Sequence, residues 1–279
     1  MQSHNIEGGG GVSLHVEEAG NRDGRSILFI HGFSQCGRAW DRQTNSDLAE
    51  DHRLVAMDIR GHGRSDKPRD AYGDAQLWAD DVRAVINALE LDHPILSGWS
   101  YGPLVMLDYV RHHGEDAIGG MNFVGGVTKI GTAEALTFLT PEFVGLVPGF
   151  FSEDPAESER ALRSLLKLCF ETELGSDDFE RMVEYNTSVP YHVRQGLFSR
   201  VVDNDDLLPK IRKPVLISQG KHDRVVKPVA AGQHKTDIPH AEIDMMNTGH
   251  ACFWDDAAAF NDRLRRFTER VFSSTASAG

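Results

Sequence analysis

The chain has little of what a disulfide-stapled, zinc-binding or membrane-spanning protein needs. It contains only three cysteines, Cys36, Cys169 and Cys252, and no C-x-x-C pair. This odd and scattered set excludes a disulfide framework and a zinc knuckle, and it predicts a reduced, cytoplasmic protein. No stretch approaches the roughly 20 apolar residues that span a bilayer, and the first residues lack the basic and apolar segments of a secretory signal. We therefore expect neither export nor membrane insertion.

Positive charge is also scarce. Lysine and arginine total 29 residues against 42 aspartates and glutamates, which gives a formal net charge of −13. A surface of this sign repels phosphate backbones and anionic lipid headgroups, so neither a nucleic acid nor a membrane is expected as a partner. The share of apolar residues, 40%, is that of an ordinary globular protein. The length fits two units, or one α/β domain with an insertion.

Short apolar runs alternate with segments of helical spacing. The runs predict buried strands at residues 26–30, 54–57, 94–97, 121–124, 214–218 and 243–246. Apolar residues at helical spacing predict one amphipathic helix behind Asp74 and another from Phe260 to Val271. The glycine run at 8–11, between two extended pieces, predicts a hairpin turn. The alternation predicts an α/β fold, with one mostly parallel sheet and helices on both of its faces.

One long segment breaks this alternation. Residues 128–208 show no convincing strand, but several helical pieces rich in large apolar side chains. We predict that this segment is an inserted helical cap, and that residues 1–127 and 209–279 form the core domain. Most of the apolar side chains in the segment are expected to pack the cap onto the core.

A glycine-flanked serine lies between the predicted strand at 94–97 and the apolar stretch at 104–107. The motif, Gly98-Trp99-Ser100-Tyr101-Gly102, is a G-x-S-x-G in the strand–turn–helix context that presents a nucleophilic serine. So tight a turn strains the backbone and requires small residues two positions away. The helix that follows aims its N-terminal N–H groups at the reaction centre. We predict Ser100 as the nucleophile.

A serine hydroxyl needs a histidine base, and that histidine needs a carboxylate to orient it. In an open parallel sheet, both are expected on loops that follow later strands. Asp223 follows the strand at 214–218 and His250 follows the last strand, which gives the chain order Ser, Asp, His. The strand at 121–124 runs into two glycines with no acid, and neither His222 nor His240 lies after the last strand. We predict Asp223 and His250 as the partners of the nucleophile.

Acyl transfer also needs N–H donors for the developing oxyanion. One is the backbone N–H of Tyr101, directly after the nucleophile. The second is predicted in the loop after the first buried parallel strand, where His31-Gly32-Phe33 offers the N–H of Phe33. His31 follows a strand and precedes a glycine, so we expect it to pin this loop rather than to act as a base.

Several aromatic residues are candidates for an apolar substrate pocket, although core packing explains those beside the catalytic positions equally well. The histidines form no H-E-x-x-H or H-x-H-x-D-H arrangement, so no metal site is expected. Position 100 is not an aspartate, which excludes dehalogenation or epoxide opening through an ester on that residue. The predicted substrate-binding residues are Phe33, Trp99, Tyr101, Phe138, Phe143 and Trp254.

At these positions the chain resembles the α/β-hydrolase superfamily over nearly its whole length. The resemblance is carried by His31-Gly32-Phe33, by the turn Asp58-Ile59-Arg60-Gly61-His62-Gly63-Arg64-Ser65, by the serine motif, and by the Asp223 and His250 loops. More narrowly, the chain is similar to the single-chain esterase and cofactor-free haloperoxidase-like branch with a helical cap. The resemblance implies a Ser-His-Asp hydrolase that needs no metal or organic cofactor, and a structural role for residues 60–65.

We expect a serine hydrolase that cleaves a carboxylic ester or lactone of a small, largely apolar compound through an acyl-enzyme. Two alternatives stay open. The same catalytic residues could hydrolyse a carbon–carbon bond of a ring-cleavage product or an acyl lactone; an arginine-bearing pocket would favour acidic ring-cleavage products, and an apolar tunnel would favour esters or acyl lactones. The chain could also be a small-molecule receptor with slow turnover. The sequence does not indicate an oligomeric state.

Overall fold

An eight-stranded sheet forms the centre of the molecule. The structure is a computed structural model and describes residues 1–276. The strand order is β1-β2-β4-β3-β5-β6-β7-β8. Every neighbouring pair from β4 to β8 is parallel, whereas β1–β2 and β2–β4 are antiparallel. The strands are β1 (Gln2–Glu7), β2 (Ser13–Gly20), β3 (Arg25–Ile30), β4 (His52–Met57), β5 (Ile95–Trp99), β6 (Gly120–Val124), β7 (Val215–Gly220) and β8 (Glu242–Met246).

The mostly parallel α/β fold is confirmed, and so is the hairpin at the glycine run. β1 and β2 pair in antiparallel register, with Ile6 opposite Leu14. Gly10 and Gly11 in the turn between them have φ angles of 68° and 78°, a region that glycine enters without steric cost. The parallel strands β3 to β7 are buried along nearly their whole length, which explains why their sequences are continuous apolar runs. The run at 243–246 does form a strand, but β8 is the edge strand and is largely accessible, so the prediction that this strand is buried is wrong.

Helices cover both faces of the sheet. One group comprises α3 (Ala75–Ala88) and α4 (Gly102–His113), which pack against each other. The other group comprises α1 (Asp41–Thr44), α2 (Leu48–Asp51), α11 (Cys252–Asp255) and α12 (Ala257–Ala276), while α10 (Val229–Asp237) packs beside β7 and β8. Asp74 is the N-cap residue of α3, since its side chain accepts a hydrogen bond from the N–H of Gln76 at 2.9 Å. No described helix has the length and apolar character needed to cross a bilayer.

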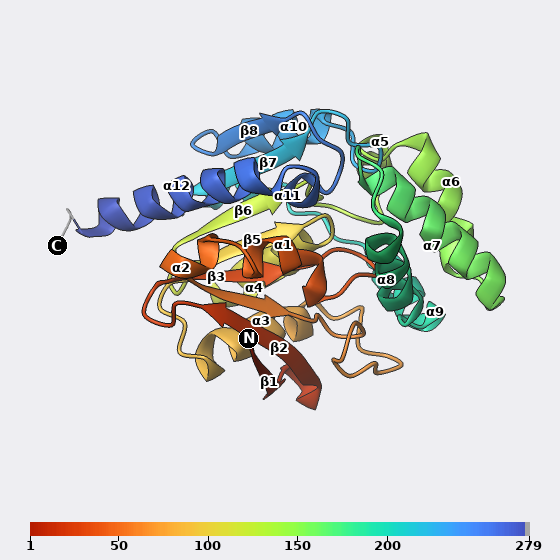
Figure 1. Ribbon diagram of the computed structural model, residues 1–279, viewed down its shortest axis with the longest axis horizontal. Helices are drawn as coiled ribbons and strands as arrows, with labels where there is room; N and C mark the ends of the chain where they lie inside the picture. The colour runs from red at the N-terminus through yellow and green to blue at the C-terminus, as the bar shows by residue number, and fades with distance from the viewer. Residues whose placement is uncertain (277–279) are drawn as a thin grey trace.

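The segment between β6 and β7 is helical. Its five helices gather at one end of the sheet, at the right of Figure 1. An isolated antiparallel bridge between Ile130 and Val202 joins the two ends of the segment. The position is the one expected for a cap, whose boundaries at residues 128 and 208 stay a prediction. The helices are α5 (Ala133–Thr137), α6 (Pro141–Phe150), α7 (Pro155–Cys169), α8 (Ser176–Thr187) and α9 (Tyr191–Phe198).

The turn at residues 58–65 is held by a buried ion pair. Arg60 and Asp81 have side chains that are 0% and 1% exposed, and the guanidinium donates to both carboxylate oxygens at 2.7 Å. The same guanidinium also donates to the carbonyl of Gly9 at 2.9 Å. Arg60 therefore ties the turn to α3 and to the first hairpin, which is a structural role.

A second buried ion pair links the helical segment to the core. Arg200, which follows α9, donates to the carboxylate of Asp108 on α4 at 2.6 Å and to the hydroxyl of Tyr101 at 3.1 Å. The side chains of Arg200 and Asp108 are 1% and 3% exposed. Burial raises the pKa of Asp108 to about 6, and the guanidinium opposes that rise. Such a pair gains little net stability, because desolvation offsets attraction, but it fixes how the two elements meet.

Replacement of one partner of the Arg200–Asp108 pair should destabilise the protein far more than replacement of both partners. Arg200→Met leaves the Asp108 carboxylate buried without its counter-charge, and we expect a loss of about 3–5 kcal/mol in the free energy of unfolding. The double variant Arg200→Met/Asp108→Leu should recover most of that loss. Urea denaturation of the wild type, both single variants and the double variant measures the coupling. A double variant no more stable than Arg200→Met would contradict this interpretation.

Candidate active site

Ser100 lies on a strained turn between β5 and α4. Its φ angle is +57°, a left-handed conformation that is rare for a residue with a side chain. The turn is possible because its flanking residues are glycines. A Cβ at Gly98 would lie 2.4 Å from the Met106 sulfur and 2.8 Å from the Gly102 carbonyl carbon, and a Cβ at Gly102 would lie 2.6 Å from the Ile30 oxygen. The motif therefore has the strand–turn–helix geometry that the sequence predicts.

The Asp223 carboxylate is held rigidly in the loop after β7. One oxygen accepts hydrogen bonds from the backbone N–H groups of Val225 and Val226, at 2.8 and 2.9 Å. The other accepts from the Gln219 side-chain amide and from Nδ1 of His250, both at 2.8 Å. With all its oxygens engaged and only 5% of the residue exposed, Asp223 has one orientation available. Gln219 had no sequence signal, because it lies in β7 directly after the apolar run at 214–218.

His250 faces Asp223 through one ring nitrogen. Since Nδ1 donates to the carboxylate, Nε2 is left as the acceptor. The backbone carbonyl of His250 accepts a hydrogen bond from the Trp99 indole N–H at 3.1 Å, and the Trp99 and His250 ring centroids lie 5.4 Å apart. His250 is 1% exposed and lines, together with Ser100, a cavity of about 30 Å³. Trp99, the residue directly before Ser100, therefore helps to position the imidazole of His250.

Two backbone N–H groups near Ser100 have no acceptor. Neither the N–H of Phe33 nor that of Tyr101 donates a hydrogen bond to any group in residues 1–276. The N–H of the next residue, Ser34, does have one, the Nε2 atom of His62 at 3.2 Å. A buried amide without a partner is costly in a folded protein, so these two are available to an oxygen of a bound molecule.

His31 holds the loop that carries Phe33. Its Nε2 accepts a hydrogen bond from the N–H of Ile59 at 3.1 Å, and its Nδ1 lies 2.8 Å from the carbonyl oxygen of Gly32. Burial lowers the pKa of His31, which keeps the ring neutral. Both ring nitrogens are thus engaged with the backbone, as expected for a residue that pins a loop.

Ser100 also lines a second, larger cavity. Its volume is about 430 Å³, within the range of small-molecule sites. Among residues 1–276, Lys129 is the one charged residue in its lining, which contains no arginine. The remaining lining residues are Phe33, Ser100, Tyr101, Val127, Ile130, Gly131, Thr132, Ala133, Ala135, Leu136, Leu139, Phe143, Phe198, Val225 and Val226.

The structure brings four of the six predicted substrate-binding residues to these two cavities. Phe33 and Phe143 line both, Tyr101 lines the larger and Trp99 the smaller. Phe138 and Trp254 line neither. Phe138 lies at the end of α5, and the centroid of its ring is 6.0 Å from the Lys129 ammonium. The Arg42 guanidinium lies over the Trp254 ring, 4.5 Å from its centroid. Trp254, in the short helix α11, lies close to His250 in the sequence, but its ring packs against Arg42 and Phe170.

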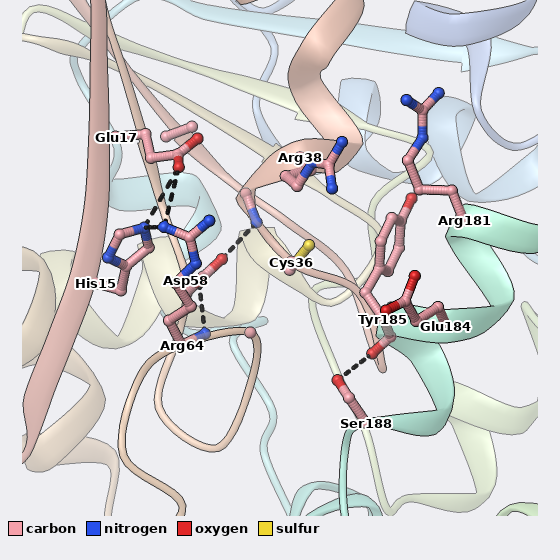
Figure 2. A pocket seen from close by; sticks show the side chains of 13 residues that line it. His15, Glu17, Cys36, Arg38, Asp58, Arg64, Arg181, Glu184, Tyr185 and Ser188 are labelled. Atoms are coloured by element: carbon pink, nitrogen blue, oxygen red, sulfur yellow. Dashed lines mark hydrogen bonds and ion pairs between the residues drawn. The ribbon is translucent and has the colours of Figure 1, made fainter. Parts of the chain in front are cut away.

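A further cavity, of about 250 Å³, lies between β2, the turn at 58–65 and α8, and Figure 2 shows its charged lining. Within this lining, Arg64 lies 3.6 Å from Glu17, whereas Arg181 pairs with Asp178, which does not line the cavity. The Asp58 carboxylate there accepts hydrogen bonds from two backbone amides at 2.6 and 2.8 Å, so it holds loops together. None of Ser100, Asp223 and His250 lines this cavity.

Comparison with known proteins identifies the family. The model of the alpha/beta hydrolase fold matches residues 25–257. The chain belongs to the α/β-hydrolase family. The AB hydrolase superfamily protein YisY of Bacillus subtilis (strain 168) is 29% identical over 271 residues, with 92% of this chain and 96% of that protein covered. The non-heme chloroperoxidase CPO-A1 of Kitasatospora aureofaciens is 27% identical over 274 residues, with 93% and 97% covered. Among solved structures, the esterase RhEst1 from Rhodococcus sp. ECU1013 has a TM-score of 0.91 and 36% identity, with 97% and 100% covered.

These relatives confirm the predicted resemblance to the esterase and haloperoxidase-like branch. None of the 276 described residues belongs to a group of three or more histidines, cysteines and acids that could hold a metal ion.

Replacement of Gly98 should damage the turn more than an ordinary glycine replacement. The Cβ of Gly98→Ala collides with the backbone of Gly102, so we expect a loss of about 1–3 kcal/mol in the free energy of unfolding. Gly232→Ala is the matched control, since a Cβ there meets nothing within 4 Å in the exposed part of α10. That variant should gain about 0.5–1 kcal/mol from helix propensity. Equal stability of the two variants in urea would overturn the steric argument.

The three cysteines should be unreactive in the folded protein. All are free and buried, and burial raises the pKa values of Cys36, Cys169 and Cys252, in the last two reinforced by Asp223. Because the thiolate is the reactive form, Ellman's reagent should modify none of them at pH 8 without denaturant and all three in guanidinium chloride. Rapid modification of the native protein would contradict the burial described here.

Proposed function

We propose that the protein hydrolyses a carboxylic ester or lactone of a small, largely apolar compound, through an acyl-enzyme on Ser100. The protein is a carboxylic ester hydrolase by comparison, since a neighbour at 36% identity over the whole chain is named an esterase. The observation that carries the assignment of residues is the 2.8 Å contact between His250 Nδ1 and Asp223, on an imidazole that lines the same small cavity as Ser100.

The proposed reaction begins with attack of the Ser100 hydroxyl oxygen on the substrate carbonyl carbon, while His250 Nε2 takes the hydroxyl proton. Asp223 holds the imidazole and stabilises the cation that forms. The oxyanion accepts hydrogen bonds from the N–H groups of Phe33 and Tyr101, which is supported by their lack of any acceptor within residues 1–276.

The tetrahedral intermediate then collapses. The bond to the alcohol oxygen breaks, and His250 gives its proton to that oxygen, so the alcohol leaves and the acyl group stays on Ser100. A water molecule, deprotonated by His250, attacks the acyl carbon, and release of the acid restores the serine hydroxyl. The helical cap of residues 128–208 is proposed to shape the substrate cavity, which is supported by the many lining residues between Lys129 and Phe198.

The residues that line the two cavities favour an ester or an acyl lactone over an acidic ring-cleavage product as the substrate. In the described part of the chain, no arginine lines either cavity at Ser100, and the ammonium of Lys129 already pairs with Glu134 and Asp205. An acidic ring-cleavage product would therefore find no free cation. The apolar lining suits the acyl chain of an ester or of an acyl lactone, and the acyl lactone is the second candidate substrate.

Removal of the nucleophile should abolish turnover. Ser100→Ala is expected to lower kcat for methyl butyrate by about 10⁴–10⁶-fold, and Asp223→Asn by about 10⁴-fold through loss of the imidazole orientation. Acid release in a pH-stat measures both. Ser97→Ala is the matched control, since this buried serine of β5 only accepts a hydrogen bond from Asn122 there. It should keep activity within a few-fold. Turnover retained by Ser100→Ala would remove this residue from the mechanism, and a single turnover in the wild type would favour a receptor.

A further inference from the structure

The two cavities that meet at Ser100 differ greatly in size. The larger has a volume of about 430 Å³ and is lined by Tyr101, whereas the smaller has about 30 Å³ and is lined by His250. On the same scale a cavity that holds one water molecule measures about 10–15 Å³, so the smaller cavity has room for a group of only two or three heavy atoms. An ester that binds here must therefore place unequal halves on the two sides of its carbonyl carbon.

The position of His250 determines which cavity receives the alcohol half of the ester and which receives the acyl half. In the proposed reaction, the alcohol oxygen must lie within hydrogen-bond reach of the imidazole that protonates it. His250 lines the smaller cavity and not the larger one. The alcohol therefore begins on the side with little space, and the acyl group is left to occupy the larger cavity.

The smaller cavity is lined mostly by buried side chains. Its back wall includes Leu165 and Cys169 of α7, which are 4% and 2% exposed, and Trp99, which is 2% exposed. Trp99 cannot move aside without breaking its hydrogen bond to the His250 carbonyl. A dense interior of this kind does not expand at low cost, so a larger alcohol meets a rigid wall.

The larger cavity has the opposite character. Its wall combines aromatic side chains with aliphatic ones such as Ile130, Leu139 and Val226, and it includes Leu136, which is 57% exposed. Each acyl methylene buried against such a wall should raise kcat/KM about fourfold until the cavity is full. The larger cavity therefore accepts a long acyl chain.

Charge is not tolerated there. The Lys129 ammonium lies 2.6 Å from Asp205 and 3.0 Å from Glu134, and its side chain is 5% exposed. These three groups carry a net charge of −1 together, so they repel a carboxylate on the acyl chain. An uncharged acyl group avoids this repulsion and the desolvation of a buried charge.

We propose that the enzyme is selective for esters of a long or bulky uncharged acid with a very small alcohol, such as methyl esters. This inference rests on the proposed function, because it takes His250 as the group that protonates the alcohol. It assigns the larger cavity to the acyl group and the smaller cavity to the alcohol.

Two isomeric esters test the assignment. Methyl octanoate and heptyl acetate have the same atoms and nearly the same hydrophobicity, but opposite arrangements about the carbonyl. We expect kcat/KM to be at least about tenfold higher for methyl octanoate in a pH-stat, since a methoxy group fits the smaller cavity and a heptyloxy chain does not. Equal values, or a preference for heptyl acetate, would overturn the assignment. If Ser100 is also inert to a fluorophosphonate and neither ester is hydrolysed, the proposed function fails as well.

Cavity variants test the same point within one chain. Leu165→Ala enlarges the smaller cavity and should raise kcat/KM for heptyl acetate about tenfold, whereas Ala135→Phe fills the larger one and should lower kcat/KM for methyl octanoate. Leu162→Ala is the matched control, since Leu162 is buried on the same helix and lines neither cavity. It should lose stability in thermal unfolding without a change in the ratio of the two substrates. A control that shifts this ratio as much as Leu165→Ala would overturn the proposal.

Discussion

The left-handed backbone at Ser100 is the constraint on which the site depends. A φ of +57° at a serine persists only where the surrounding structure enforces it. Here the N–H of Ser100 donates to the carbonyl of Val124 at 2.9 Å, and its carbonyl accepts from the N–H of Val127 at 3.0 Å. β6 and the chain after it thus hold the turn from the side, while Gly98 and Gly102 leave room for it. The same geometry frees the N–H of Tyr101 for a ligand.

The helical segment between β6 and β7 is linked to both loops that offer a free N–H group. Arg200 donates to the Tyr101 hydroxyl, and the Ser34 hydroxyl donates to the carbonyl of Asn186 on α8 at 3.1 Å. The side chains on this segment also form much of the wall of the larger cavity. The same segment therefore contacts both the larger cavity and the loops of the two proposed oxyanion donors.

Local sequence signals predicted the parts of the structure that depend on local physics. Buried strands read as apolar runs, the glycine run gave the β1–β2 hairpin, and the glycines around Ser100 indicated a tight turn. The sheet order and the pairing of Gln219 with Asp223 depend on contacts between distant segments, so no local pattern contained them. Phe138 and Trp254 show the same limit: an aromatic residue near a catalytic position can face either way, and only packing decides. The Arg200–Asp108 pair joins residues 92 positions apart and had no signal at all.

The central claim is that His250, oriented by Asp223, activates the hydroxyl of Ser100. The most direct measurement is the rate of covalent modification by a fluorophosphonate, with the modified peptide mapped by mass spectrometry, in the wild type and in His250→Gln. We expect a single adduct on Ser100 that forms at least about a hundredfold more slowly in His250→Gln than in the wild type. An adduct on another residue, or the same rate with and without His250, would contradict it.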